Sequence, residues 1–235
     1  MPLLNWISDN DLELAINLLL KKALDAKKNA VAQFGKNVID PFSAVFEISG
    51  FEMDYDTWIK SETARQAQKT LQNHVGEFHQ NILGSCKDWE NMKTGHVIDL
   101  VSKKNKIIAE IKNKYNTISG GKLSDLYYSL EKLVMQKASI YKNYTSYYVS
   151  IIPKKPIRFN KEFTPSDKEK GDKCSLNTKI REIDGASFYE LVTGESNALE
   201  NLYDILPKVI YECSNGQFEV KNMDNLKYSF YQAFG

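Results

Sequence analysis

The chain has 235 residues, of which 42% are hydrophobic and 26% charged, a balance typical of a globular protein with a hydrophobic core. Its formal net charge of +1 excludes a uniformly basic nucleic-acid-binding protein, and no apolar run approaches the ~20 residues that span a bilayer. Three widely spaced cysteines argue against a disulfide framework, and the N-terminus lacks the basic region of a signal peptide, so we expect reduced thiols in a cytoplasmic protein.

Helical patterns occupy the first quarter of the chain. Apolar side chains recur at helical spacing over residues 9 to about 33, which predicts a long amphipathic helix. Asp40 and Pro41 form a helix-start signal, and Gly50 predicts the end of a short second helix. The buried face of that short helix is expected to comprise Ala44, Val45 and Ile48. We interpret residues 1–60 as a helical scaffold without a catalytic group.

The most regular helix pattern covers residues 61–83. Its apolar positions recur every three or four residues, and Gly84 lies where a helix C-cap is expected. Glu77 lies on the polar flank of this helix, which leads towards the strand that carries Asp99. Glu77 is therefore either a further carboxylate close to that strand or a glutamate that faces solvent.

A strand pair follows in which acidic and basic side chains converge. Ile107–Lys112 is rich in β-branched residues, and strand alternation places Glu110 and Lys112 on one face and the apolar residues on the other. A short turn over residues 102–106 brings Asp99 alongside as a hairpin. Mg²⁺ prefers hard oxygen ligands, so two carboxylates beside a lysine predict a magnesium site for phosphodiester hydrolysis. The alternative for Glu-x-Lys is a solvated strand face with a surface ion pair.

The next segment predicts a parallel crossover. Residues 113–121 are polar and glycine-rich, which predicts a loop at the same end of the sheet as Lys112. A helix capped by Ser124 and extending to about Ile140 leads into a strand over residues 146–152. A strand, a helix and another strand imply a parallel pair, so the sheet is expected to be mixed, with N-terminal helices covering one face.

Residues 154–181 carry an excess of positive charge. Nine lysines and arginines against four acids give this segment +5, so the rest of the chain sums to −4. The segment has little hydrophobic periodicity and several prolines, which predicts a long functional loop. It is either a footprint for a polyanion or a solvated charged loop.

The C-terminal part predicts a strand followed by helices. Residues 180–185 predict a short strand and turn, and Ser187 with Glu190 predicts a capping box that opens a helix. A last helix is expected over residues 196 to 212, with an interruption or kink at Pro207. The tail is rich in aromatic residues, which indicates either a docked terminal segment or an oligomer contact.

Taken together in this order, Asp99 and Glu110-x-Lys112 resemble the core of the PD-(D/E)XK nucleases. Ile98 stands where that motif has proline, a tolerable departure because the aspartate carries the chemistry. More specifically, four segments resemble type II restriction endonucleases that cut GGNCC- or GGWCC-like palindromes. These segments are residues 72–81, 97–101, 108–117 and 180–194, and the resemblance runs from about residue 60 to 210.

The resemblance implies an α/β restriction-endonuclease-like fold, with a mixed central sheet flanked by helices and an α-helical N-terminal region. We expect a single endonuclease domain over residues 1–235. Its expected parts are the N-terminal scaffold (1–60), a catalytic core (61–153), a basic DNA-recognition segment (154–181), and C-terminal helices with a tail (182–235).

The resemblance also implies the roles of single residues. Asp99 and Glu110 are expected to bind Mg²⁺, with Ile111 as a further metal-binding position, and Lys112 is expected to assist the attacking water. Glu77 matches a helix carboxylate that many members place near the metals. A homodimer is implied, each subunit cutting one strand of double-stranded DNA to leave 5′-phosphate and 3′-hydroxyl ends. Neither a nucleotide cofactor nor a membrane is expected as a partner.

DNA contacts are expected from the basic segment, because lysine and arginine meet guanine O6 and N7 in the major groove. The candidates there are Lys154, Lys155, Arg158, Lys173, Lys179 and Arg181. Asn113, Lys114 and Asn116 either reach the phosphate backbone or are ordinary loop residues. Two alternative functions remain at this point. One is a repair or junction nuclease of the same superfamily, and the other is a DNA-binding protein without catalysis.

Overall fold

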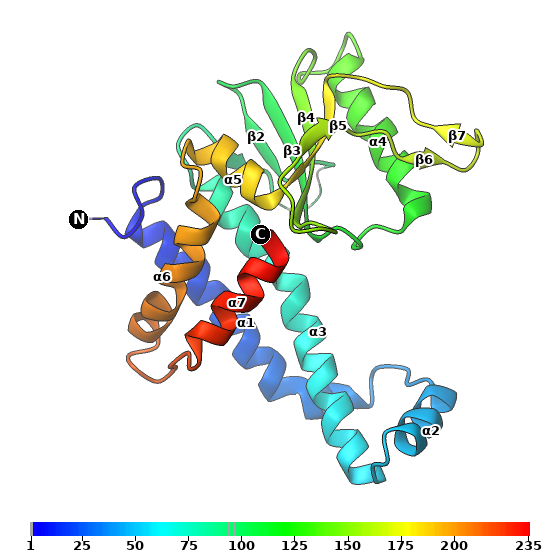
Figure 1. Ribbon diagram of the computed structural model, residues 1–235, viewed down its shortest axis with the longest axis vertical. Helices are drawn as coiled ribbons and strands as arrows, with labels where there is room; N and C mark the ends of the chain where they lie inside the picture. The colour runs from blue at the N-terminus through cyan, green and yellow to red at the C-terminus, as the bar shows by residue number, and fades with distance from the viewer. Residues whose placement is uncertain (1, 94, 96) are drawn as a thin grey trace.

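The computed structural model describes residues 2–93, 95 and 97–235 and shows a mixed sheet flanked by helices (Figure 1), which confirms the predicted α/β architecture. Six strands pair in the order β1-β2-β3-β4-β8-β5. These strands are β1 (Glu90–Asn91), β2 (Leu100–Ser102), β3 (Ile107–Lys114), β4 (Thr145–Ile152), β8 (Ile180–Asp184) and β5 (Asn160–Glu162). A separate two-stranded sheet pairs β6 (Ser166–Asp167) with β7 (Asp172–Lys173).

The helices pack on both faces of the sheet, and two of them extend away from it as a long arm. They are α1 (Asp9–Phe34), α2 (Pro41–Gly50), α3 (Tyr55–Gly84), α4 (Gly120–Met135), α5 (Gly185–Thr193), α6 (Ala198–Cys213) and α7 (Met223–Phe234). The long helices α1 and α3 lie side by side and extend away from the sheet, and α2 lies at the far end of this arm (Figure 1). Among the described residues, no helix is both long enough and apolar enough to cross a membrane.

The strand pairing confirms the hairpin and the crossover. β2 and β3 are antiparallel, with Leu100 opposite Ala109. β3 and β4 are parallel, with Glu110 opposite Tyr148, and α4 connects them. β8 adds in parallel to β4, and β5 closes that edge in the antiparallel sense, so the sheet is mixed as predicted.

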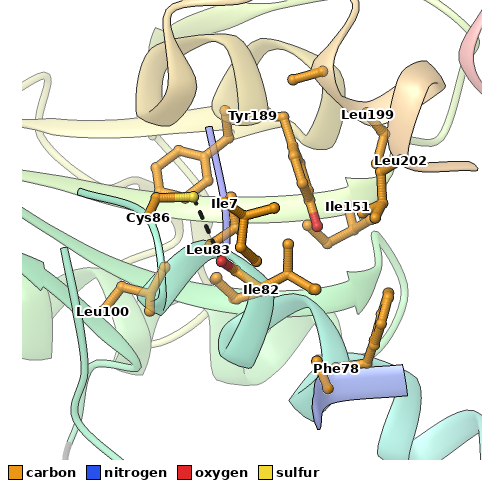
Figure 2. Close-up of a cluster of buried hydrophobic side chains, with 14 of the residues drawn as sticks. Ile7, Phe78, Ile82, Leu83, Cys86, Leu100, Ile151, Tyr189, Leu199 and Leu202 are labelled. Carbon is orange, nitrogen blue, oxygen red and sulfur yellow. Dashed lines mark hydrogen bonds between the residues drawn. The ribbon is translucent and has the colours of Figure 1, made fainter. Parts of the chain in front are cut away.

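Each face of the sheet carries its own hydrophobic cluster. Ala109 and Ile111 of β3 pack with side chains of α1, α3, α5 and α6, and Figure 2 shows part of this cluster around Ile82 and Leu83. Ile108 and Tyr148 pack on the opposite face with side chains of α4. The N-terminal helices therefore cover one face, as predicted. The strand alternation that separates these clusters also leaves Glu110 and Lys112 on the α4 face.

Three helix starts differ from the predictions. α3 begins at Tyr55 rather than residue 61, because Asp54 caps it by accepting a hydrogen bond from the Thr57 N–H at 2.7 Å. α4 begins at Gly120, so the predicted cap at Ser124 is wrong, and the helix ends at Met135 before Ile140, which is 81% exposed. In α4, packing of buried side chains against the sheet outweighs the low helix propensity of two glycines.

At α5 the predicted capping box is also wrong. The N-cap is Asp184, whose carboxylate accepts the Ser187 N–H at 2.9 Å, and the helix starts at Gly185. The Ser187 hydroxyl instead accepts a hydrogen bond from Arg158 Nε at 3.2 Å. α6 runs through Pro207 without interruption. In the tail, α7 buries Phe230 against Tyr203 of α6, with ring centroids 4.7 Å apart, which is the docked alternative.

The basic segment is not one long loop. β5 forms the edge strand beside β8, and β6 with β7 forms a small hairpin. Phe163 and Cys174 are buried in the cluster under α4, so both ends of that hairpin are tied to the core. Strands of two or three residues are too short to show a period of two, which is why the sequence pattern missed them.

The predicted burial of α2 is wrong. The helix forms where expected, and the Asp40 carboxylate caps it by accepting the Phe42 and Ser43 N–H groups. None of its residues is fully buried: Ala44 and Ile48 are half-buried, and Val45 is 66% exposed. The helix packs against α3 at the end of the arm, and none of its residues belongs to the two hydrophobic clusters beside the sheet.

Candidate active site

The three predicted catalytic side chains lie together on and beside β3. Strand alternation places Glu110 and Lys112 on one face, where Lys112 Nζ lies 2.6 Å from Glu110 Oε1. Asp99 immediately precedes β2, and its backbone N–H donates to the Ala109 carbonyl at 2.9 Å. The antiparallel register of the hairpin thus brings Asp99 beside the β3 pair, as the sequence predicted.

The Asp99 carboxylate is held by the backbone of β3. Its Oδ2 accepts the Ile111 N–H at 2.6 Å. This N–H lies beyond the last residue pair of the β2–β3 ladder, Leu100 with Ala109, so the aspartate side chain takes the place of the next strand residue. The hydrogen bond fixes the direction in which the remaining carboxylate oxygen points.

Glu110 holds its proton more tightly than an ordinary glutamate. Burial raises the pKa of Glu110, the nearby negative charge of Asp99 raises it further, and Lys112 lowers it, with a net value of about 7. The Glu110 side chain is only 12% exposed. Two carboxylates held close together in a buried position are the arrangement that a divalent cation relieves.

Lys112 is held in its charged form. Burial alone would lower the pKa of this amine, but its hydrogen bond and ion pair with Glu110 raise it above the usual value. An ammonium group at this position can donate hydrogen bonds to water or to a phosphate oxygen. It cannot accept a proton while it remains charged.

The donor set fits Mg²⁺. Asp99 and Glu110 supply hard carboxylate oxygens, and Mg²⁺ retains several waters, so two carboxylates suffice at such a site. The Ile111 side chain is 2% exposed and belongs to the core, so only its backbone carbonyl can serve as the predicted further ligand. Within the described part of the chain, no three His, Cys, Asp or Glu residues converge, so backbone, water or substrate oxygens must complete the shell.

Glu77 lies on α3 near this site but is engaged elsewhere. Its Oε2 lies 3.0 Å from His74 Nδ1, and its side chain is 58% exposed. It lines a polar hollow of about 280 Å³ together with Lys112. The structure thus brings Glu77 to the rim of the site without bringing it to Asp99 and Glu110.

The same hollow contains the predicted loop residues. Asn113, Lys114 and Asn116 line it from β3 and the following turn, and Gln72, Asn73 and Gln80 line it from α3. The amide residues of α3 were not predicted as site residues. Their spacing along one helix flank was visible in the sequence, but only the packing of α3 against β3 shows that this flank faces Lys112.

Tyr148 and Ser150 were also missed. They lie on β4 directly beside Glu110 and Lys112 in the parallel register, and both are 5% exposed. The Tyr148 hydroxyl is buried and has no geometrically acceptable hydrogen-bond partner among the described residues. The sequence did contain a signal, because strand alternation places Tyr148 and Ser150 on one face of β4, as it places Glu110 and Lys112 on one face of β3.

The predicted DNA-binding residues of the basic segment are four lysines, which lie at three places on the molecule, and two arginines. Lys154 and Lys155 are exposed and follow the C-terminal end of β4, next to the end of β3 that carries Lys112. Lys179 precedes β8 and lies beside the opposite, N-terminal end of β4, where its carbonyl accepts the Ser146 N–H. Lys173 is exposed on β7.

The two arginines of that set are tied to acidic groups of the chain itself. Arg158 NH2 lies 2.5 Å from Glu190 Oε2. Arg181 bonds Asn160 and lies 3.4 Å from Glu162, which joins β8 to β5. Both guanidinium groups therefore have structural partners, whereas Lys154, Lys155 and Lys173 form no ion pair with the residues that the structure describes.

Comparison with known proteins points to one family of restriction endonucleases. The family model described as Eco47II restriction endonuclease matches residues 4–214, which include Asp99, Glu110 and Lys112. The chain is similar to the type II restriction enzyme Eco47II of Escherichia coli, with 49% identity over 240 residues that cover 100% of both chains. It is also similar to the type II restriction enzyme Sau96I of Staphylococcus aureus, with 32% identity over 210 residues that cover 87% of this chain and 78% of the relative.

Proposed function

The chain belongs to the Eco47II restriction endonuclease family, and we propose that it cuts DNA with the centre formed by Asp99, Glu110 and Lys112. As a member of this family it is a type II restriction endonuclease, a site-specific deoxyribonuclease that acts on double-stranded DNA. The observation that carries the assignment of the centre is the contact of Lys112 with Glu110, beside the Asp99 carboxylate anchored on the Ile111 N–H.

Mg²⁺ is the proposed cofactor. Asp99, Glu110 and the Ile111 carbonyl would hold it, and when bound it lowers the pKa of a water and polarises the phosphoryl oxygen. The carboxylates must be ionised to bind a metal, so protons compete with the ion at Glu110, whose pKa is about 7 in the metal-free protein. The β3 backbone keeps Asp99 oriented during this exchange.

Lys112 is proposed to act as a donor. Its ammonium group orients the attacking water and offsets the negative charge that grows on the phosphate. The charged form is the one that the contact with Glu110 favours. Hydrolysis by this route leaves a 5′-phosphate and a 3′-hydroxyl end. We propose a supporting rather than a metal-binding role for Glu77, in keeping with its contact with His74.

The proposed substrate is a short palindromic site of the GGNCC or GGWCC kind, on the resemblance of residues 72–81 and 180–194 to endonucleases that cut such sites. A palindrome is read by a two-fold symmetric protein, so we propose a homodimer in which each subunit cuts one strand. Lys154 and Lys155 are proposed phosphate contacts beside the centre, with Lys114. Lys173 and Lys179 are proposed contacts farther along the duplex. We place the enzyme in the cytoplasm, where its three unpaired cysteines remain reduced.

The test is cleavage of a long duplex of known sequence by the purified protein, with Mg²⁺ or with a chelator, followed by sequencing of the ends. Discrete Mg²⁺-dependent fragments with symmetric 5′-phosphate ends at one palindrome are expected. A continuous smear of fragments, or cleavage confined to junctions and flaps, would contradict the proposed substrate.

A further inference from the structure

Exposed apolar side chains gather at the far end of the helical arm, where Figure 1 shows α2. We call it the arm-tip patch. It consists of Val31, Val38, Phe42, Val45, Phe46, Phe51 and Tyr55. Each of these side chains is at least 63% exposed, and Val38 is fully exposed. Large apolar side chains scattered singly over a surface need no explanation, but seven within 25 residues at one end of the molecule indicate an interaction site.

α2 turns Ala44, Glu47 and Ile48 inwards, where they are half-buried, and leaves its larger apolar side chains exposed. Glu47 faces α3, where its carboxylate accepts the Trp58 Nε1–H at 2.9 Å. Phe42, Val45 and Phe46 follow the i, i+3, i+4 spacing of a single helix face, and all three are exposed. The hydrogen bond to Trp58, which is itself buried, holds the helix in place while its apolar face points away from the molecule.

A groove lies between the two helices of the arm, α1 and α3. It has a volume of about 390 Å³ and is lined mostly by apolar side chains. Ala30, Phe34, Ile59 and Ala64 line it, together with Lys27 and Lys60. Small alanines on both helices leave space that the chain itself does not fill.

We propose that the arm-tip patch is the interface with a second copy of this chain, with α2 of each copy packed into the α1–α3 groove of the other. This proposal rests on the proposed function, because one chain carries one Asp99–Glu110–Lys112 centre, and cutting both strands of a palindrome requires two. A two-fold contact uses the same patch on both partners, so helix and groove pair reciprocally.

The area of the patch is sufficient. Given exposures of 63–76%, the four aromatic rings present on the order of 600 Å² of apolar surface per copy. The three valines bring this close to the roughly 800 Å² per partner that a standard specific interface buries. The patch also has the composition of an interface core, because four of its seven residues are aromatic and none is charged.

The composition of α2 does not suit binding to DNA or to a membrane surface. The helix contains no lysine or arginine, whereas a DNA-binding surface must neutralise phosphates. Helices that lie on membranes also carry cations on their polar face, whereas the only charged side chain of α2 is the acidic Glu47. A second copy needs no such charge.

The test is the association state of the full-length protein, measured by sedimentation velocity across a concentration series. The wild type is expected at twice 26.9 kDa. Phe42→Ser combined with Phe46→Ser is expected to raise the dimer dissociation constant by at least about a hundredfold. Ala64→Arg places a large charged side chain in the groove that receives α2, so it is expected to raise the dissociation constant by a similar factor. These variants should keep the wild-type circular dichroism spectrum, because the altered side chains are exposed in the single chain.

Ile140→Ser combined with Leu176→Ser is the matched control, because it removes two equally exposed apolar side chains elsewhere on the surface. This control is expected to remain dimeric. A monomeric wild type, or arm-tip variants as dimeric as the control, would overturn the interface and leave the active centre untouched. A dimeric wild type that fails to cut any duplex would instead overturn the proposed function, and Lys112→Ala should be dimeric but inactive.

Discussion

The stability of the metal-free protein should depend on pH through Glu110, and one substitution isolates this contribution. The pKa of this carboxyl rises from 4.5 to about 7 on folding, because of burial first and of Asp99 second. A shift of this size corresponds to about 3 kcal/mol of folding free energy. Glu110→Gln keeps the shape of the side chain and removes its charge, so the variant escapes this cost.

The sign of the effect follows from the two protonation states. Below pH 4.5 the carboxyl is protonated in both the folded and the unfolded protein, so wild type and variant are similar in stability. As the pH rises from 4.5 through 7, the unfolded state loses its proton first and the folded wild type is destabilised. Glu110→Gln should therefore be more stable than wild type at pH 8 by about 3 kcal/mol, and by far less at pH 5.

The assay is urea unfolding in chelator at a series of pH values. With a slope of about 3 kcal/mol per molar urea for a chain of this size, the midpoint difference should reach about 1 M at pH 8. Added Mg²⁺ should stabilise wild type and close the gap. Glu90→Gln, which removes an exposed carboxylate from the same sheet, controls for net charge. A stability difference that stays constant with pH would refute the reasoning that Glu110 is buried beside Asp99.

Three further outcomes test other parts of the structure. Glu77→Ala should slow cleavage by less than the ~100-fold cost of removing a direct transition-state contact, because its carboxylate pairs with His74; a larger loss of kcat in single-turnover assays would place it at the metal. Lys154→Ala and Lys155→Ala should each weaken DNA binding to a similar extent for all sequences. Each should also lower the salt dependence of the binding constant, measured by fluorescence anisotropy, by about one released ion. An unchanged salt dependence would exclude phosphate contacts by these lysines. Gly185→Ala should lower stability by at least ~2 kcal/mol in thermal or urea unfolding, because its Cβ would lie 2.7 Å from a backbone carbon of β4; an unchanged midpoint would contradict this close approach.

The β2–β3 hairpin shows which features of the site the local sequence pattern can predict. The alternation of apolar and charged residues in β3 was enough to place Glu110 and Lys112 together, because the period of a strand is fixed by its backbone. The short polar turn placed Asp99 nearby. The hydrogen bond from Ile111 N–H to Asp99 was not predictable, since it depends on where β2 stops pairing with β3.

Several predictions failed where tertiary contacts decide the outcome. The pattern of α2 shows that a helix has an apolar face, but it does not show that the face lies at the end of an arm without a covering element. The start of α4 was missed because glycines are poor helix formers in isolation, while packing on the sheet extends the helix through them. Tyr148 and Ser150 join the site only through the parallel register of β4 with β3.

The central claim is that the Asp99–Glu110–Lys112 centre performs the cleavage, and single-turnover cleavage by Lys112→Ala tests it most directly. Lys103→Ala is the matched control, because Lys103 is an exposed lysine in the turn of the same hairpin and pairs with Glu90. The account predicts that Lys112→Ala loses at least ~100-fold in the cleavage rate with Mg²⁺ while it still binds the duplex, and that Lys103→Ala cuts at the wild-type rate. Wild-type cleavage by Lys112→Ala would place the chemistry elsewhere on the molecule.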